Sequence, residues 1–488
     1  MTENATDQHQ VRIQKLQALR EAGVEPFAYS YSKTHDSAQL VEKFDSLAEA
    51  QTTVSIAGRL MTIRSMGKSI FANLQDDAGQ IQIYVKKDAV AEGEFEVFKK
   101  ADLGDIFGVE GYLFLTKMGE KSVHVSKVTL LAKSLRPMPE KWHGLQDKET
   151  RYRRRYLDMI ANPEVREVFK KRSLIVRALR DFLDGEGFVE VETPVLQPIY
   201  GGAAARPFIT HHNRLDVDLF MRVADELYLK RLIVGGFEKV WEFCKDFRNE
   251  GMDRNHNPEF TMIELYWAYA DYQDVMKLYQ RMITTVATKV LGTTTITFGE
   301  NQIELGGEWR VLPMLDGISE AVGRDISQMD EPTLRKFCGE IGVKTEGLVG
   351  RGKLIDELFS EKLEHKLIQP TFITDYPKEL SPLAKPHRSK EGLTERFEVF
   401  IGGMEMGNAF SELNDPIDQK ERFQKLVELA KAGDEEAPAV LDEDYIFCLE
   451  HGMPPTGGLG FGVDRLCMML LNQHSIRDVI LFPQMKPE

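Results

Sequence analysis

One polar turn between two apolar runs constrains the fold of this chain more than any other stretch. Residues 246–264 place two arginines, a histidine, an aromatic ring and three glutamates around a turn that contains asparagine and proline. The apolar runs at 237–243 and 260–269 are typical of strands or buried segments, so we expect a long hairpin loop between them. Arginine offers a fixed fork of donors to phosphate or carboxylate, and an aromatic ring offers a face to a purine. A solvated, charged hairpin is the alternative that composition alone favours.

The length and composition predict a multidomain protein that is not embedded in a membrane. The chain has 488 residues, and 42% of them are apolar. This suffices for two or more domains that each have a hydrophobic core. No window approaches the ~20 uninterrupted apolar residues of a membrane span, and the N-terminus lacks the pattern of a signal peptide. Four cysteines lie far apart in the sequence, so we expect reduced thiols in a cytoplasmic protein and no structural zinc.

The charge is distributed unevenly along the chain. A net charge of −15 argues against a general nucleic-acid binder, because contacts to phosphate need a local excess of lysine and arginine. Residues 1–150 carry 19 basic and 21 acidic side chains, whereas the remainder carries 43 and 56. The N-terminal part could therefore face RNA.

The first 150 residues predict a small β domain behind a helical extension. Residues 1–50 form the expected extension, in which the apolar spacing of residues 8–23 indicates a short amphipathic helix that ends at a glycine. Five strand-like segments with one helical interruption follow, and they fit an OB-type β-barrel over 51–138. Another small all-β domain remains an alternative. Residues 139–150 are the expected linker, which the preceding proline pair stiffens.

The exposed positions of this β domain contain a candidate RNA-binding surface. OB-folds use their second and third strands to stack bases and contact phosphates. A lone phenylalanine on a strand is more often part of the core than a stacking platform. The candidates for RNA contact are Arg59, Arg64, Lys68, Phe71 and Gln82.

Three motifs follow one another along the rest of the chain. A helix-to-strand segment at 187–196 contains a proline, the Phe-Arg-Asn-Glu segment 247–250 precedes His256 and Phe260, and a glycine-rich run at 458–465 ends in arginine. In this order they resemble motifs 1, 2 and 3 of the class II aminoacyl-tRNA synthetases. In that family motif 1 forms a homodimer interface and motif 3 presents an arginine to ATP.

The resemblance covers roughly residues 12–486 and implies an α+β protein. The N-terminal OB-fold β-barrel would hold the tRNA anticodon. A class II catalytic domain over 151–488 would contain a mixed, mainly antiparallel sheet flanked by helices. The helix-rich stretch at about 325–370 is similar to the small helical insertion of bacterial members.

One segment indicates which amino acid is activated. A lysine pocket should place carboxylates deep, with a hydroxyl or an aromatic wall along the methylenes. Residues 403–415 are similar to the lysyl branch, class IIb, with Glu412 as the acid, and contain no basic residue of the kind that aspartyl enzymes need. The resemblance therefore implies a lysine–tRNA ligase acting on L-lysine, ATP and tRNA(Lys).

The resemblance also assigns roles to individual residues. Arg248 and Arg465 would be catalytic. The lysine-binding residues would be Gly202 and Glu226 at the α-ammonium, Asn408 at the carboxylate, Phe410 on the stem, and Glu264, Tyr266 and Glu412 at the ε-ammonium. The ATP-binding residues would be Arg248, Glu250, His256, Phe260, Glu398, Glu405 and Arg465. The Mg²⁺ ligands would be Glu398 and Glu405.

The sequence bears on three alternative functions. A catalytically inactive or regulatory RNA-binding paralogue would be expected to lack Arg248, Glu398, Glu405 or Arg465, and all four are present. A truncated paralogue that lysylates a translation factor lacks the β domain. An asparaginyl or aspartyl enzyme is disfavoured by Glu412.

Overall fold

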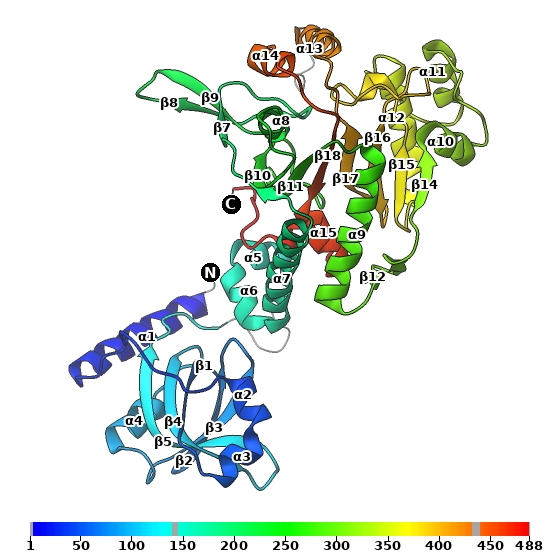
Figure 1. Cartoon of the computed structure of the whole chain (residues 1–488). Helices are drawn as coiled ribbons and strands as arrows, with labels where there is room; N and C mark the ends of the chain where they lie inside the picture. The colour runs from blue at the N-terminus through cyan, green and yellow to red at the C-terminus, as the bar shows by residue number, and fades with distance from the viewer. Residues whose placement is uncertain (1–2, 139–144, 432–439, 488) are drawn as a thin grey trace. The chain divides into compact units, whose positions relative to one another are not determined.

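The chain divides into two compact units. The computed structural model describes residues 3–138, 145–431 and 440–487. Unit 1 spans Met1–Gln146 and unit 2 spans Asp147–Glu488 (Figure 1). Among these described residues, every helix is too short or too polar to cross a membrane.

Unit 1 is a closed five-stranded barrel with helices. Its strands are joined in the order β1-β2-β3-β5-β4, and only β3 and β5 pair in parallel (Figure 1). The elements are α1 (Glu3–Glu21), α2 (Ser37–Glu42), α3 (Phe44–Glu49), β1 (Val54–Met66), β2 (Ser69–Gln75), β3 (Gln80–Lys86), α4 (Glu92–Lys99), β4 (Ile106–Leu115) and β5 (Lys121–Ala132). The predicted OB-type barrel is confirmed, with the helical interruption between β3 and β4.

Alternation along the strands fills the barrel. On β3, Ile81, Ile83 and Val85 are buried, while Gln82 and Tyr84 between them point outward. The helix α1 is attached by Arg12, whose Nη1 donates to the carbonyl oxygens of Leu103 (3.1 Å) and Arg136 (2.9 Å). These contacts join the N-terminal helix to the end of the barrel.

The linker is shorter than the sequence predicts. Residues 139–144 lie outside the described residues, and α5 (Lys148–Arg153) begins inside the range expected to be linker. The carboxylate of Asp147 accepts a hydrogen bond from the backbone N–H of Thr150 at 2.9 Å, which caps this helix. The expected linker range 139–150 must therefore end before Lys148.

Unit 2 contains three sheets and many helices. The helices are α5, α6 (Arg155–Ala161), α7 (Pro163–Gly185), α8 (Glu226–Val234), α9 (Tyr272–Leu291), α10 (Met314–Val322), α11 (Glu331–Glu340), α12 (Arg351–Lys362), η1 (Glu364–Lys366), η2 (Lys378–Leu380), α13 (Pro416–Lys431), α14 (Glu443–Glu450), α15 (Val463–Leu470) and α16 (Ile476–Val479). The strands are β6 (Val189–Glu190), β7 (Leu196–Gln197), β8 (Ile209–His212), β9 (Val217–Met221), β10 (Lys239–Phe247), β11 (Glu259–Ala268), β12 (Thr295–Phe298), β13 (Asn301–Glu304), β14 (Arg310–Pro313), β15 (Thr371–Thr374), β16 (Arg396–Ile401), β17 (Met404–Ser411) and β18 (Thr456–Gly462).

An eight-stranded sheet organises this unit. Its order is β14-β15-β16-β17-β18-β11-β10-β6, and the pairs are antiparallel except at the two edges. The mixed, mainly antiparallel sheet is thus confirmed. The hairpin loop is also observed, because Phe247 of β10 pairs with Glu259 of β11.

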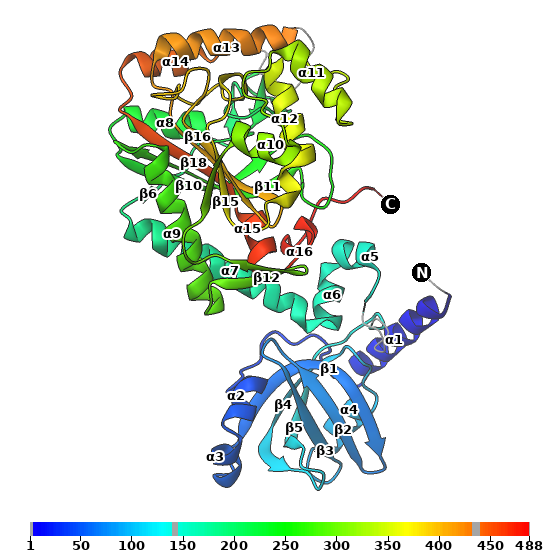
Figure 2. The ribbon, with the colours of Figure 1, turned by 90° about the vertical axis from the view of Figure 1, so that its right-hand side faces the viewer.

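One face of this sheet is covered by helices. Trp241, Leu265, Leu459 and Ala409 pack with buried side chains of α7, α9 and α15 in one large core. Figure 2 shows α9 lying along the sheet. Because side chains alternate along a strand, the residues between these point to the opposite face.

The helices α10, α11 and α12 share a separate apolar cluster with strands of the large sheet. Leu334 and Phe337 of α11 pack with Leu354 and Leu358 of α12, and this cluster also includes Phe400 of β16. The helical stretch expected at 325–370 therefore packs on the sheet near its β14 edge.

Gly111 provides a test of the barrel packing. A Cβ at this position would lie 2.1 Å from the carbonyl oxygen of His124 on β5, so the backbone would have to move. We expect Gly111→Ala to destabilise unit 1 by about 1–3 kcal/mol. Hydrogen exchange of the barrel amides, measured on the full chain, should become faster.

The matched control is Gly93→Ala in α4. A methyl group there would meet no described atom within 4 Å. Alanine inside a helix stabilises by about 0.5–1 kcal/mol relative to glycine, so exchange should stay the same or slow down. Equal exchange in both variants would contradict the assigned packing.

Candidate active site

The register of neighbouring strands aligns several of the predicted site residues in two rows across the sheet. The first row runs through Glu398, Asn408, Gly460 and Glu264. The second row runs through Arg396, Phe410, Gly458 and Tyr266. The rows are two residues apart on each strand, so they share a face, and this face is opposite the large core.

Glycines on β18 make room above this face. A Cβ on Gly458 would lie 2.0 Å from Glu412 Oε1 and 2.6 Å from Tyr266 Cε1. At Gly460 it would lie 3.3 Å from Met262 Cε. The glycine-rich strand therefore forms a low floor between the taller side chains of β11 and β17.

A cavity of about 660 Å³ opens above the floor. Its volume lies within the range of small-molecule sites. All the site residues predicted in unit 2 line it: Gly202, Glu226, Arg248, Glu250, His256, Phe260, Glu264, Tyr266, Glu398, Glu405, Asn408, Phe410, Glu412 and Arg465. The structure thus brings together side chains separated by more than two hundred residues in sequence.

One end of the cavity is acidic and buried. Glu226, Glu264 and Glu412 are all buried, and the hydroxyl of Tyr266 donates to Glu264 Oε2 at 3.2 Å. Burial raises the pKa of Glu264 and of Glu412, because desolvation penalises the charged carboxylate. A cation is the ligand that would relieve this penalty.

Lys230 of α8 lies in the same acidic end, and sequence analysis missed it. Its ammonium forms ion pairs with Glu226 Oε1 and Glu412 Oε2, and it lies 5.7 Å and 5.6 Å from the ring centres of Tyr266 and Phe410. The spacing of four residues between Glu226 and Lys230 on a helix could have indicated the first pair. The second pair joins segments far apart in the chain.

The other end of the cavity is formed by the hairpin loop and the motif 3 helix. The guanidinium of Arg248 lies 5.1 Å from the ring centre of Phe260. Arg465 Nη1 donates to the carbonyl oxygen of Glu405 at 2.7 Å, and its Nη2 donates to His256 Nε2 at 3.2 Å. Because Arg465 can only donate, Nδ1 of His256 carries the proton that faces Asp253 Oδ2 at 2.8 Å.

Two carboxylates lie between these ends. A register shift skips Met406, so Glu405 lies opposite Phe400 and shares the face of Glu398. Burial and the charge of Glu405 together raise the pKa of Glu398 to about 7, although Arg396 opposes the shift. Tyr376 also donates to Glu398 Oε2 at 2.8 Å. Neighbouring carboxylate oxygens are the hard donors that Mg²⁺ prefers, so this pair fits a magnesium ion.

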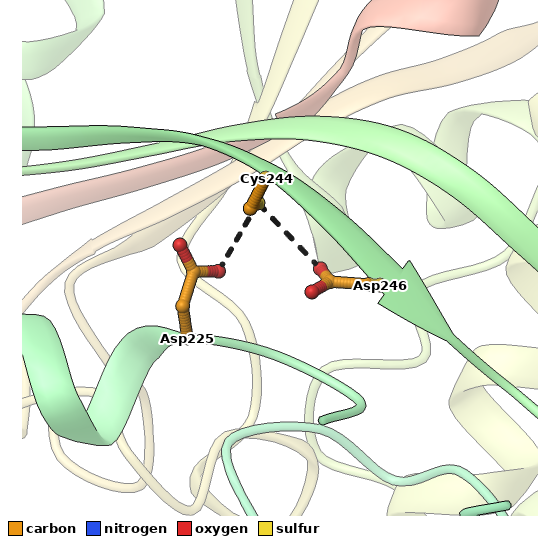
Figure 3. A group of neighbouring side chains, drawn as sticks. All are labelled: Asp225, Cys244 and Asp246. Atoms are coloured by element: carbon orange, nitrogen blue, oxygen red, sulfur yellow. Dashed lines mark hydrogen bonds between the residues drawn. The ribbon is translucent and has the colours of Figure 1, made fainter. Parts of the chain in front are cut away.

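A thiol and two carboxyl groups form a second buried cluster (Figure 3). Cys244 Sγ donates to Asp225 Oδ1 at 3.3 Å and lies 4.0 Å from Asp246 Oδ2. Burial raises the pKa of Asp225 to about 8 and that of Asp246 to about 6. Burial therefore favours the protonated form of Asp225. Arg222 Nε lies 3.4 Å from Asp246 Oδ1 and offsets part of the negative charge.

The barrel brings some of the predicted RNA contacts together. Arg64 pairs with Phe71 across β1 and β2, and Phe71 pairs with Tyr84 of β3, two residues from Gln82. Lys68 lies in the turn between β1 and β2. Arg59 is separate, since its Nη1 donates to the carbonyl oxygen of Gly104 at 2.8 Å.

Further rings extend this barrel face, and sequence analysis missed them. The ring centres of Phe71 and Tyr84 are 4.7 Å apart, and those of Tyr84 and His124 are 5.3 Å apart. Tyr112 stacks on His124 at 4.9 Å. Alternation along residues 80–85 could have placed Tyr84 on the face of Gln82.

The motif 1 segment exposes apolar side chains at a sheet edge. Val189 of the edge strand β6 is 46% exposed and Leu196 of β7 is 49% exposed. An edge strand with uncovered apolar groups is a common place for subunit contacts.

Comparison with known proteins agrees with this geometry. Residues 147–486 match the family described as tRNA synthetases class II (D, K and N), and residues 54–131 match the OB-fold nucleic acid binding domain. A lysine–tRNA ligase of Carboxydothermus hydrogenoformans is 55% identical over 98% of this chain and 97% of its own length. The lysine–tRNA ligase of Bacillus subtilis is 52% identical over 99% of this chain and 98% of its own length. The chain belongs to the class II tRNA synthetases of the D, K and N group.

Proposed function

We infer that this protein is a lysine–tRNA ligase. It activates L-lysine with ATP to lysyl-adenylate and pyrophosphate, and then transfers the lysyl group to the 3′ end of tRNA(Lys). The buried acidic end of the cavity carries this inference, because three carboxylates and the hydroxyl of Tyr266 suit a long side chain that ends in an ammonium. The names of the similar proteins support the same activity.

The lysine would lie along the floor of β18. Glu226 beside Gly202 would hold the α-ammonium, and Asn408 and Arg248 would hold the carboxylate. Phe410 would pack on the methylenes. Glu264, Tyr266 and Glu412 would surround the ε-ammonium at the buried end of the cavity.

The nucleotide would occupy the end formed by the hairpin loop. Phe260 and Arg465 would enclose the adenine, and Glu250 and His256 would contact the nucleotide. Glu398 and Glu405 would hold Mg²⁺ together with phosphate oxygens. The bound ion would neutralise charge on the phosphates.

The reaction needs no nucleophile from the protein. The carboxylate of lysine attacks the α-phosphorus of ATP in line, and pyrophosphate leaves. A terminal ribose hydroxyl of the tRNA then attacks the adenylate carbonyl, and AMP leaves. The protein contributes orientation and charge neutralisation, chiefly through Arg248 at the α-phosphate.

The remaining partners follow from the other surfaces. The ring-bearing face of the barrel would contact the anticodon of tRNA(Lys). The apolar edge around β6 would join two copies in a homodimer. Free thiols at all the cysteines fit a reducing compartment, so we place the enzyme in the cytoplasm.

Amino-acid-dependent exchange between ATP and pyrophosphate tests the function directly. With each of the twenty common amino acids offered in turn, we expect exchange with lysine alone. Exchange that is strongest with aspartate or asparagine, or absent with every amino acid, would overturn the assignment.

Glu412→Gln tests the acidic end. Removing one partner of a buried charge pair costs about 3–5 kcal/mol, so the KM for lysine should rise by two or more orders of magnitude. The KM for ATP should change little. Glu421→Gln on the exposed side of α13 is the matched control and should leave both constants unchanged.

Arg248→Lys tests the phosphate contact. Lysine keeps the positive charge but loses the two-pronged geometry that can bridge a carboxylate and a phosphate. Single-turnover formation of lysyl-adenylate should slow by about 10²–10³-fold, the usual loss for one donor at a developing charge. Arg281→Lys on the exposed face of α9 is the control, and equal rates in the two variants would remove Arg248 from this role.

Phe71→Ala tests the barrel face. Loss of base stacking costs about 1–3 kcal/mol per base, so the KM for tRNA should rise by about 5–100-fold. Lysine-dependent exchange needs no tRNA and should be unaffected. Tyr29, whose side chain is fully exposed outside the ring cluster, supplies the control variant Tyr29→Ala.

A further inference from the structure

We propose that Lys230 is a positioning residue of the lysine pocket, which fixes Glu226 and Glu412 in place through an ion pair to one oxygen of each. This inference rests on the proposed function. It assigns a role in substrate binding to a side chain of the protein that is itself a lysine.

Each of the two carboxyl groups pairs with Lys230 through one of its oxygens. Lys230 pairs with Glu226 Oε1 and Glu412 Oε2, which leaves one oxygen free on each group. Glu226 Oε2 lies 3.8 Å from a Cβ built on Gly202, at the cavity wall. Glu412 Oε1 lies over Gly458 and has no hydrogen-bond partner among the described residues. Both residues line the cavity, so the ion pairs with Lys230 fix two carboxyl groups beside the space expected for the substrate.

The charge balance of the pocket requires such a cation. Burial raises the pKa of Glu226 and of Glu412, and Lys230 is the strongest influence that lowers them again. Burial alone would lower the pKa of Lys230, but Glu226 and Glu412 raise it above its ordinary value. The ammonium thus stays charged and favours ionisation of both carboxylates.

Other groups around Lys230 do not replace it. Tyr266 of β11 and Phe410 of β17 present ring faces to the ammonium, and Glu264 of β11 adds negative charge to the pocket. Tyr445 of α14 lies near enough to interact electrostatically, and its hydroxyl has no hydrogen-bond partner in the described part of the chain. Arg396 of β16 also favours the ionised form of Glu226, more weakly than Lys230 does.

An ordinary helix salt bridge is the competing explanation. Pairs spaced four residues apart on an exposed helix surface add little stability and serve no site. Lys230 is instead 0% exposed, and its second partner comes from the end of β17. These observations favour a role in the pocket over a role in α8 alone.

Lys230→Met tests the proposal by steady-state exchange between ATP and pyrophosphate. We expect the KM for lysine to rise at least 100-fold, the KM for ATP to stay within about threefold, and kcat to fall less than the KM for lysine rises. Between pH 6 and 8.5, the KM for lysine should fall more steeply with pH than in the unmodified protein, because the unpaired carboxyl groups ionise later.

A second readout separates missing charge from damaged packing. Lys230→Ala should regain lysine-dependent exchange when n-propylammonium is added, because this cation can occupy the vacated space. The same cation should not stimulate the unmodified protein. Should Lys230→Met fail to fold, as judged by circular dichroism, Lys230→Gln keeps donor hydrogens without charge and should show the same KM and pH behaviour.

Lys133→Met is the matched control. Lys133 is a buried lysine of unit 1 held between Asp102 (2.6 Å) and Asp105 (2.9 Å), so its loss removes a similar bridge far from the pocket in sequence. Its exchange kinetics should be unchanged. An unchanged KM for lysine in a folded Lys230 variant, or an equal loss of lysine and ATP use without pH dependence or rescue, would overturn the proposal. Absence of lysine-dependent exchange in the unmodified protein would instead overturn the proposed function.

Discussion

Several carboxyl groups are buried at one face of the large sheet. The cost of removing them from water determines which charged and polar groups must lie around them. Glu226, Glu264 and Glu412 line the cavity, and Asp225 is also buried. A buried carboxylate is costly unless a cation or hydrogen-bond donors compensate it, or unless it takes up a proton. The structure uses both solutions, since Lys230 pairs with two of the glutamates and burial raises the pKa of Asp225 to about 8.

This electrostatic arrangement depends on the backbone of the sheet. The other face of the sheet buries its apolar side chains against α7, α9 and α15, so the polar side chains of the strands collect on the face that carries the carboxylates. Gly458 brings the backbone of β18 close to Glu412 and Tyr266, where any side chain would collide. Side chains alternate between the two faces of the sheet. The apolar core therefore lies on one face, and the glycine floor and the acidic pocket lie on the other.

Much of the fold could be predicted from local patterns. Alternation along the N-terminal strands indicated the barrel, and the polar turn between apolar runs indicated the β10–β11 hairpin. Local patterns do not encode long-range register. The skipped residue Met406, which turns Glu405 toward Glu398, and the pairing of Lys230 with Glu412 both depend on how distant strands and helices meet. Sequence analysis also did not predict where α5 begins, because the only signal is the capping residue Asp147.

The location of Lys230 gives a physical reason why the glutamates of this pocket can attract the ammonium of a substrate. Three buried glutamates in a vacant cavity would take up protons, and a protonated carboxyl group attracts an ammonium only weakly. The ammonium of Lys230 pairs with two of them and favours their ionised forms. The substrate then meets carboxyl groups that are already oriented, so less of its binding energy is spent on rearranging the site.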